Sequence, residues 1–211
     1  MIGGRIIKLF NPRGVKYNNF KKKVLACNFK WEYLNDTLDF GADEEVADTI
    51  QCLTPEQKKE KNWGQFPMYN NCILQRAEAP IAAIGTPLYF PTLPEANYAS
   101  QQLAMEASMI VQDILKANRI KLNMIFRMHL NAVDPQPDGV RTGWPHTDHE
   151  YPHYNLLLYF TDAGGDTLRM ERDYKYENYT PNEDDCVIFD GIHFHETPKE
   201  KRRVVFVCTY A

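Results

Sequence analysis

The spacing of apolar residues changes near residue 120 and divides the chain into a helical part and a strand-rich part. Between residues 95 and 118, the apolar positions Leu103, Ala107, Ile110, Val111, Ile114 and Leu115 recur at helical spacing, which predicts an amphipathic helix. Over residues 121–132 the period falls to two, which predicts a half-buried strand with Arg127 and His129 on its polar side.

Further segments extend this division. Residues 43–53 read as a helix, and Thr54 followed by Pro55 predicts the start of another. Short strands are predicted over residues 155–161, 167–170, 185–189 and 203–210, with turn signals between them. This series is typical of a β-sandwich or jelly roll. The aromatic-rich stretch 62–71 reads as a loop that serves either as a lid or substrate wall, or as an anchor to the core.

Length and composition narrow the class of protein. A chain of 211 residues fits a single domain, which we divide into a mixed helical part (1–120) and a strand-rich core (121–211). A net charge of -4 disfavours nucleic acid as a partner.

Five scattered cysteines without a C-x-x-C pair favour a reducing compartment. No signal peptide or membrane span is evident, so a cytoplasmic location is expected. Oligomeric state is not readable.

The tripeptide His146-Thr147-Asp148 is the strongest chemical signal. Residues two apart on an extended chain project to the same side, so this histidine and aspartate can reach one metal ion. An isolated H-x-D is usually a chance solvated pair, but five of the six histidines fall within residues 146–195. Either His193 or His195 can supply a third ligand, and two imidazoles with one carboxylate form the ligand set of non-haem ferrous iron.

The order of motifs after residue 120 resembles the iron(II)/2-oxoglutarate-dependent dioxygenases, particularly small prolyl-hydroxylase-like and phage-type members. The resemblance covers about residues 120–211 and rests on H-x-D, the apolar strand with Tyr159, the Gly164-Gly165 turn, the Phe189-Asp190-Gly191 block with His195, and an arginine opening the last strand. It implies an α+β fold, a double-stranded β-helix (jelly roll) with the N-terminal helices packed on one sheet. Nothing in the first 120 residues carries the resemblance.

The resemblance also implies roles for individual residues. His146, Asp148 and His195 look like the iron ligands, Arg203 looks like the partner of the distal carboxylate of 2-oxoglutarate, and Tyr159 looks like a hydrogen-bond donor to that carboxylate. Arg127 lies on a strand face that in the family can look into the pocket. An arginine also balances charge, because Fe(II), the aspartate and 2-oxoglutarate together leave one negative charge.

Several alternatives stay open at the level of sequence. His193 and His195 face the same way on a strand, and the Phe-Asp-Gly block favours His195. Arg203 lies eight residues after His195, somewhat short of common family spacings, and Arg202 is the reserve. Tyr159 can simply pack in the sheet, and the face with Arg127 and His129 can be solvated. His149, Glu150 and His153 are expected near the mouth of the pocket.

The implied activity is an Fe(II)/2-oxoglutarate-dependent dioxygenase that uses O2, with ascorbate as a stimulant. It would hydroxylate a peptidyl side chain such as proline, or a small metabolite, and release succinate and CO2. One alternative is a metal-dependent hydrolase using His146, Asp148 and His149. The other is a non-catalytic jelly-roll binding module.

Overall fold

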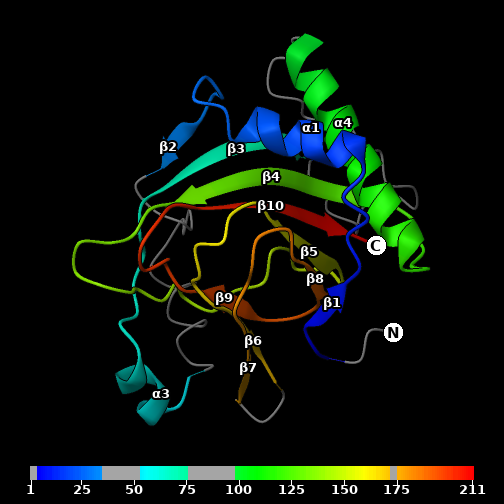
Figure 1. The fold of residues 1–211 in the computed structure, drawn as a ribbon. Helices are drawn as coiled ribbons and strands as arrows, with labels where there is room; N and C mark the ends of the chain where they lie inside the picture. Colours follow the sequence, from blue (N-terminus) through cyan, green and yellow to red (C-terminus); the bar gives the residue numbers. More distant parts are fainter. Residues whose placement is uncertain (1–3, 35–52, 76–97, 172–174) are drawn as a thin grey trace, which may run out of the picture.

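Two antiparallel β-sheets face each other in the computed structural model, which describes residues 4–34, 53–75, 98–171 and 175–211 (Figure 1). The large sheet has the order β1-β8-β5-β10-β4-β3-β2 and the small sheet the order β7-β6-β9. The large-sheet strands are β1 (Ile7–Leu9), β2 (Glu32–Leu34), β3 (Met68–Gln75), β4 (Ile125–Val133), β5 (Tyr154–Tyr159), β8 (Cys186–Phe189) and β10 (Arg203–Tyr210). The small-sheet strands are β6 (Thr167–Met170), β7 (Tyr176–Tyr179) and β9 (His193–His195).

The chain path after residue 120 alternates between the two sheets. It runs through β4, crosses to an isolated antiparallel bridge between His146 and β9, returns in β5, crosses in β6 and β7, and returns in β8. It then crosses in β9 and ends in β10 between β4 and β5. This path is a double-stranded β-helix, so the predicted α+β jelly roll is confirmed.

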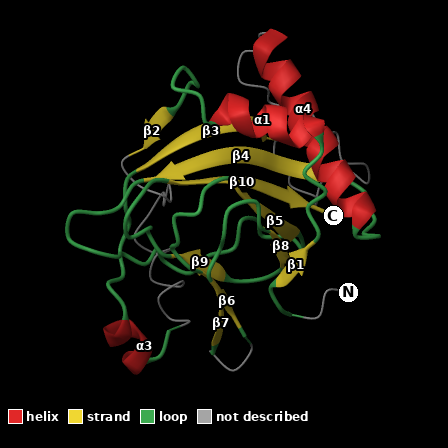
Figure 2. Cartoon of the chain, viewed as in Figure 1, coloured by secondary structure: helices red, strands yellow, loops and turns green. Residues whose placement is uncertain are grey.

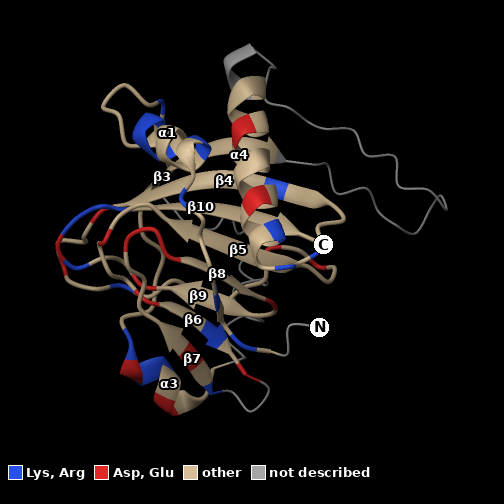
Figure 3. Ribbon diagram, turned by 45° about the vertical axis from the view of Figure 1, so that its right-hand side comes forward, with Lys and Arg blue, Asp and Glu red and all other residues tan. Residues whose placement is uncertain are grey.

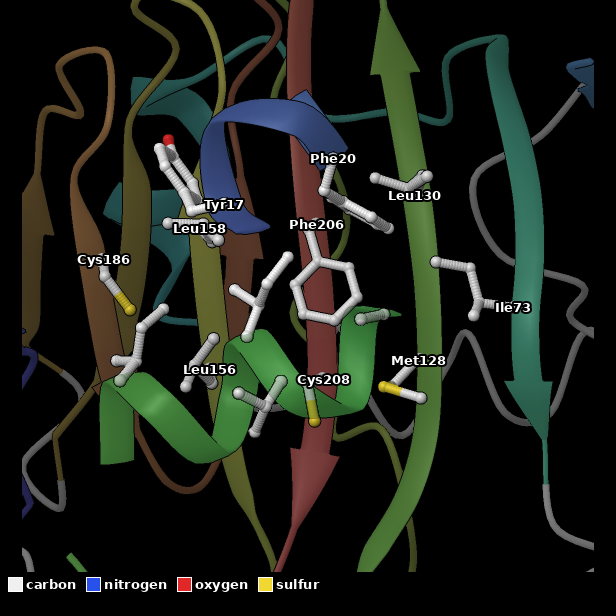
Figure 4. Close-up of a cluster of buried hydrophobic side chains, with 14 of the residues drawn as sticks. Tyr17, Phe20, Ile73, Met128, Leu130, Leu156, Leu158, Cys186, Phe206 and Cys208 are labelled. Atoms are coloured by element: carbon white, nitrogen blue, oxygen red, sulfur yellow. The ribbon is translucent and has the colours of Figure 1, made fainter. Parts of the chain in front are cut away.

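Two helices, α1 (Val15–Val24) and α4 (Tyr98–Ala117), cover the outer face of the large sheet (Figure 2). The main apolar cluster lies between them and the sheet, and Figure 4 shows Phe20 of α1 above Phe206 of β10. The expected packing of the N-terminal helices on one sheet is therefore confirmed. The apolar positions predicted for the long helix lie in this cluster, with Val111 fully buried.

The helix α3 (Pro55–Glu60) starts after Thr54, as the sequence predicted, and it starts with a capping box. The Thr54 side chain accepts a hydrogen bond from the Gln57 backbone, the Gln57 side chain accepts one from the Thr54 backbone, and Pro55 is the first helical residue. The helix predicted over residues 43–53 lies, except for Leu53, outside the described residues. Figure 3 shows that α3 and α4 each carry residues of both charge signs. None of the described helices is long and apolar enough to cross a membrane.

The first 120 residues also contribute β1, β2 and β3 to the large sheet, strands that the sequence did not predict. The loop assigned to residues 62–71 is wrong from Met68 onward, where β3 pairs with β4. The two adjacent asparagines in β3 resemble a turn signal, and a register shift after Cys72 breaks its alternation. In β4, a bulge opposite Thr209 and Tyr210 places Ile125, rather than Phe126, in the apolar cluster.

Candidate metal centre

His146, Asp148 and His193 meet between the two sheets, each offering one ligand atom within 4.8 Å of the others. The isolated bridge brings the two histidines together, because each backbone N–H donates to the other residue's carbonyl at 2.9 Å. Their ring centroids lie 4.5 Å apart. Asp148 follows two positions after His146, so its carboxylate reaches the same point.

Backbone carbonyls set the tautomers of both histidines. Nδ1 of His146 lies 2.9 Å from the Trp144 carbonyl, and Nδ1 of His193 lies 3.2 Å from the Gly191 carbonyl. A carbonyl only accepts, so each Nδ1 donates and the lone pair of a neutral ring is left on Nε2. Burial lowers the pKa of His193 to about 3. This histidine is therefore neutral at pH 7, as a metal ligand must be.

The Asp148 carboxylate is held by Arg127 on one oxygen only. Arg127 donates a hydrogen bond to Oδ1, whereas Oδ2 is buried without a hydrogen bond and lies 3.4 Å from Nε2 of His193. Burial by itself raises the pKa of Asp148, but His193 and Arg127 more than offset it, so the pKa lies well below its ordinary value. The group is a carboxylate with one uncommitted oxygen at the centre of the cluster.

The third member of the cluster differs from the sequence prediction, which chose His195. That histidine lines the same cavity, but its Nδ1 shares a hydrogen bond of 2.9 Å with Thr167, and its ring centroid lies 6.4 Å from that of His146. The bridge places His193, not His195, opposite His146. A signal was present, because Arg203 follows His193 by ten residues and His195 by only eight.

Arg203 begins β10, is buried, and points into the cavity, as predicted. Its Nη1 donates to the carbonyls of Gly165 and Glu196 at 3.0 and 2.8 Å, its Nε is buried without a partner, and no carboxylate pairs with it among the described residues. Burial lowers the pKa of this guanidinium. Gly165 has φ +81°, and a Cβ there would lie 2.6 Å from the Glu196 carbonyl, so the predicted Gly-Gly turn is what admits the arginine.

Arg202, the reserve candidate, faces away from the cavity. Its guanidinium forms a two-pronged ion pair with Asp134, with both N–O distances at 2.7 Å, and lies over the Tyr69 ring. Adjacent strand residues point to opposite faces of a sheet. Arg203 is therefore the arginine available to a ligand in the cavity.

Tyr159, Arg127 and His129 all line the cavity, so the face of β4 that carries Arg127 and His129 looks into the cavity. Tyr159 bonds through its hydroxyl to Thr167 at 2.6 Å, and burial raises its pKa to about 12. Burial also lowers the pKa of His129 to about 3. Arg127, expected to contact co-substrate or substrate, instead holds the Asp148 carboxylate.

The cavity measures about 800 Å³, and one of its walls is formed by residues of the stretch 62–71 together with β4. Asn70 of β3 donates to Asn131 of β4 at 2.7 Å, and both line the wall. Phe66 and Met68 add an apolar section. Trp63 stacks on Trp144 with ring centroids 5.9 Å apart. The aromatic stretch 62–71 thus contains both an anchor and part of the cavity wall.

His149 stands apart from the metal cluster. Its Nε2 shares a hydrogen bond of 2.7 Å with Thr209, and its ring stacks on Tyr151 with centroids 4.8 Å apart. Among the described residues, the metal-ligand group consists of His146, Asp148 and His193. The geometry therefore does not support a hydrolase centre built from His146, Asp148 and His149.

Comparisons with known proteins give matches among solved structures only. No protein-family model and no curated protein matches the sequence. The chain is similar to a 2OG-Fe(II) oxygenase family oxidoreductase from Burkholderia pseudomallei, with 12% identity, a TM-score of 0.49, and coverage of 96% of this chain and 93% of that one. It is also similar to a Pseudomonas putida prolyl-4-hydroxylase (14% identity, TM-score 0.37, 92% and 97% coverage).

A third similar structure is a full-length Neurospora crassa protein in complex with alpha-KG, with 14% identity, a TM-score of 0.43, and coverage of 97% of this chain and 74% of that one. The structures that this chain resembles thus include 2-oxoglutarate oxygenases. At these identities and TM-scores, structural similarity does not assign an activity to this protein. A functional proposal therefore has to rest on the residues of the cavity.

Proposed function

We propose that this protein is an iron(II)- and 2-oxoglutarate-dependent oxygenase that hydroxylates a peptidyl side chain or a small metabolite and releases succinate and CO2. The observation that carries the proposal is the convergence of His146, Asp148 and His193 in the cavity that also contains the buried, carboxylate-free Arg203. The histidines and the aspartate can bind a metal ion, and the guanidinium of Arg203 can bind a carboxylate.

The donor set fits ferrous iron. Two imidazoles and one carboxylate on one side of an ion are the ligand set of non-haem iron oxygenases, and they leave the remaining coordination positions for a co-substrate and O2. The uncommitted Oδ2 of Asp148 and the two Nε2 lone pairs are the atoms that would hold the ion. When bound, Fe(II) would supply the activation of O2, and the surrounding residues would orient the reactants and exclude water.

Arg203 fits the distal carboxylate of 2-oxoglutarate. A buried guanidinium without a carboxylate is costly, and a bidentate carboxylate ligand offsets that cost through two charge-assisted hydrogen bonds. Fe(II), Asp148, 2-oxoglutarate and Arg203 together sum to zero charge. Arg127 adds a positive charge on the other side of Asp148, where its side chain is 24% exposed and so partly solvated.

The wall of β3 and β4 fits an uncharged polar group of the substrate. The amides of Asn70 and Asn131 offer both donors and acceptors, and Phe66 and Met68 supply apolar contact. A peptide segment or an amino-acid-sized metabolite has this mixture of groups. A cavity of about 800 Å³ is large enough to hold 2-oxoglutarate together with a side chain of such a substrate.

The test is the weak visible absorption band that forms when Fe(II) and 2-oxoglutarate are mixed with the protein without oxygen. We expect the band in wild-type protein and, once O2 is admitted with ascorbate, slow formation of succinate. His193→Ala should abolish both while circular dichroism shows a retained fold. If folded wild-type protein gives neither band nor succinate, the assignment is wrong, and a metal site without turnover would favour the binding module instead.

A further inference from the structure

Beside the metal cluster, His195 lines the same cavity as the proposed iron ligands and Arg203. Its ring centroid lies 5.3 Å from that of His193, and the carbonyl of the next residue, Glu196, accepts a hydrogen bond from Nη1 of Arg203 at 2.8 Å. The side chains of His193, His195 and Arg203 all line the cavity. A molecule that connects the metal to Arg203 would therefore share this cavity with the His195 ring.

A buried chain of hydrogen bonds fixes that ring. Tyr159 Oη lies 2.6 Å from Thr167 Oγ1, which in turn lies 2.9 Å from Nδ1 of His195. Thr167 is fully buried and Tyr159 is 1% exposed. Each hydroxyl carries one hydrogen and a neutral imidazole carries one. The two bonds use two of these three hydrogens, so the third must point elsewhere.

The direction in which the hydrogen bonds of Tyr159, Thr167 and His195 run decides where the third hydrogen lies. If both Tyr159 and His195 donated to Thr167, the threonine hydrogen would be left buried without an acceptor, which is costly. If His195 donated to Thr167 and Thr167 to Tyr159, the tyrosine hydrogen would be left without an acceptor, because Thr167 is the hydrogen-bond partner of this 1% exposed side chain among the described residues. The tyrosine therefore donates to Thr167. Thr167 then donates to Nδ1, and the hydrogen of the imidazole sits on Nε2. On the far edge of the ring from Thr167, this N–H is available to the cavity.

We propose that His195 is a co-substrate-binding residue, which donates a hydrogen bond from Nε2 to a carboxylate oxygen of 2-oxoglutarate, with Thr167 and Tyr159 holding it in the donor tautomer. The inference rests on the proposed function. It separates two histidines that the local sequence pattern treats alike. His193 has a backbone carbonyl at Nδ1 and presents a lone pair, whereas His195 has a hydroxyl at Nδ1 and presents a hydrogen.

The experiment measures two affinities in the same variants. Mn(II) binding in the absence of 2-oxoglutarate, followed by electron paramagnetic resonance, reports the metal ligands. A 2-oxoglutarate titration of the anaerobic Fe(II) protein, followed by its visible band, reports co-substrate binding. His195→Leu should leave Mn(II) affinity within about threefold and weaken 2-oxoglutarate binding by about 10- to 100-fold. His193→Leu should instead lose Mn(II) binding.

Two further variants sharpen the test. His195→Gln keeps an N–H donor near the position of Nε2 and should recover part of the lost affinity. Thr167→Val keeps the side-chain shape, removes the link to Tyr159, and should weaken 2-oxoglutarate binding without changing Mn(II) affinity. Arg202→Ala, at the residue just before β10 whose side chain pairs with Asp134, is the matched surface control and should change neither affinity.

The inference is overturned if His195→Leu loses Mn(II) binding as His193→Leu does, because His195 is then a ligand. It is also overturned if the variant binds 2-oxoglutarate as tightly as wild type. Failure of the proposed function looks different, because wild-type protein would then bind Mn(II) without forming the Fe(II)–2-oxoglutarate band at all. Thermal unfolding of each variant checks that the fold is retained.

Discussion

The two faces of the large sheet are built from alternate residues of the same strands, yet they do opposite things. On β10, Val204, Phe206 and Cys208 enter the apolar cluster beneath the helices, whereas Arg203, Val205 and Val207 line the cavity. On β4, Met128, Leu130 and Ala132 are fully buried, whereas Arg127, His129 and Asn131 face the cavity. Along each of these strands, residues that pack in the core therefore alternate with residues that line the cavity.

The two faces differ mainly in the groups that they bury, although the helix-covered face also buries one hydroxyl without a hydrogen-bond partner, that of Tyr210. The helix-covered face is closed by apolar contacts, and burial of that surface is the main source of stability. On the cavity face, buried atoms such as Asp148 Oδ2, Arg127 Nε and Arg203 Nε have no hydrogen-bond partner. Unsatisfied polar atoms cost stability, and they are the atoms that a metal and an acidic co-substrate would engage. The two faces should therefore respond differently to substitution.

The largest effect should follow from removing the carboxylate of the metal cluster. We expect Asp148→Ala to weaken Mn(II) binding by more than about 100-fold, because losing a ligand should cost more than losing a supporting residue. The free energy of unfolding, measured with urea, should change far less, since the Asp148 side chain is outside the apolar cluster. A variant with wild-type Mn(II) affinity would show that the cluster is not the metal centre.

The opposite response is expected on the helix-covered face. Phe206→Ala should lower the free energy of unfolding by about 3–5 kcal/mol, because a fully buried ring leaves a cavity. The folded fraction should still bind Mn(II) normally. Val205→Ala, one residue away on the cavity face, is the matched control and should cost less than half as much. Equal losses at both positions, measured by urea unfolding, would contradict the division of the faces.

A third comparison uses neighbouring arginines. Arg203→Met should raise the 2-oxoglutarate dissociation constant by about 10- to 100-fold, since a charge-assisted pair contributes about 1.5–3 kcal/mol. Arg202→Met removes a half-exposed ion pair with Asp134 and should leave the constant unchanged. Anaerobic titration of the Fe(II) protein measures both. The reverse pattern would assign the co-substrate to the outer face.

The smallest effect concerns pH and the attachment of α1. Asp184 accepts hydrogen bonds from Tyr17 and Lys21 of this helix. Burial by itself raises the pKa of Asp184, but these two bonds outweigh it and the pKa is lowered. An unfolded aspartate titrates near about 3.9, so this stabilisation is complete above that pH and is lost as the pH falls through the lower folded pKa.

Asp184→Asn should therefore make the free energy of unfolding less steeply dependent on pH between about 5 and 3. Asparagine tolerates the positive φ of 67° at this position, so the backbone needs no adjustment. Chemical unfolding at a series of pH values gives the slope. An unchanged slope would mean that Asp184 does not stabilise the attachment of α1.

Much of the fold was readable because it depends on local periodicity. The helical spacing before residue 118 and the strand patterns after it predicted α4 and five strands, β4, β5, β6, β8 and β10, at close to their observed positions. Strands β1, β2 and β3 were missed because they are short or polar, and their strand conformation comes from pairing with distant partners. The Asn70 and Asn131 wall was missed for the same reason.

The sequence by itself determined which residue types could form a centre: an H-x-D pair, a nearby histidine and an arginine opening the last strand. The choice of Arg203 followed from the resemblance, in which an arginine opens the last strand. Only the tertiary structure decided between His193 and His195, because both sit on the same side of one strand and the spacing to Arg203 gave only a weak preference for His193. The bridge that pairs His193 with His146 joins segments 47 residues apart, and such a register is set by long-range pairing.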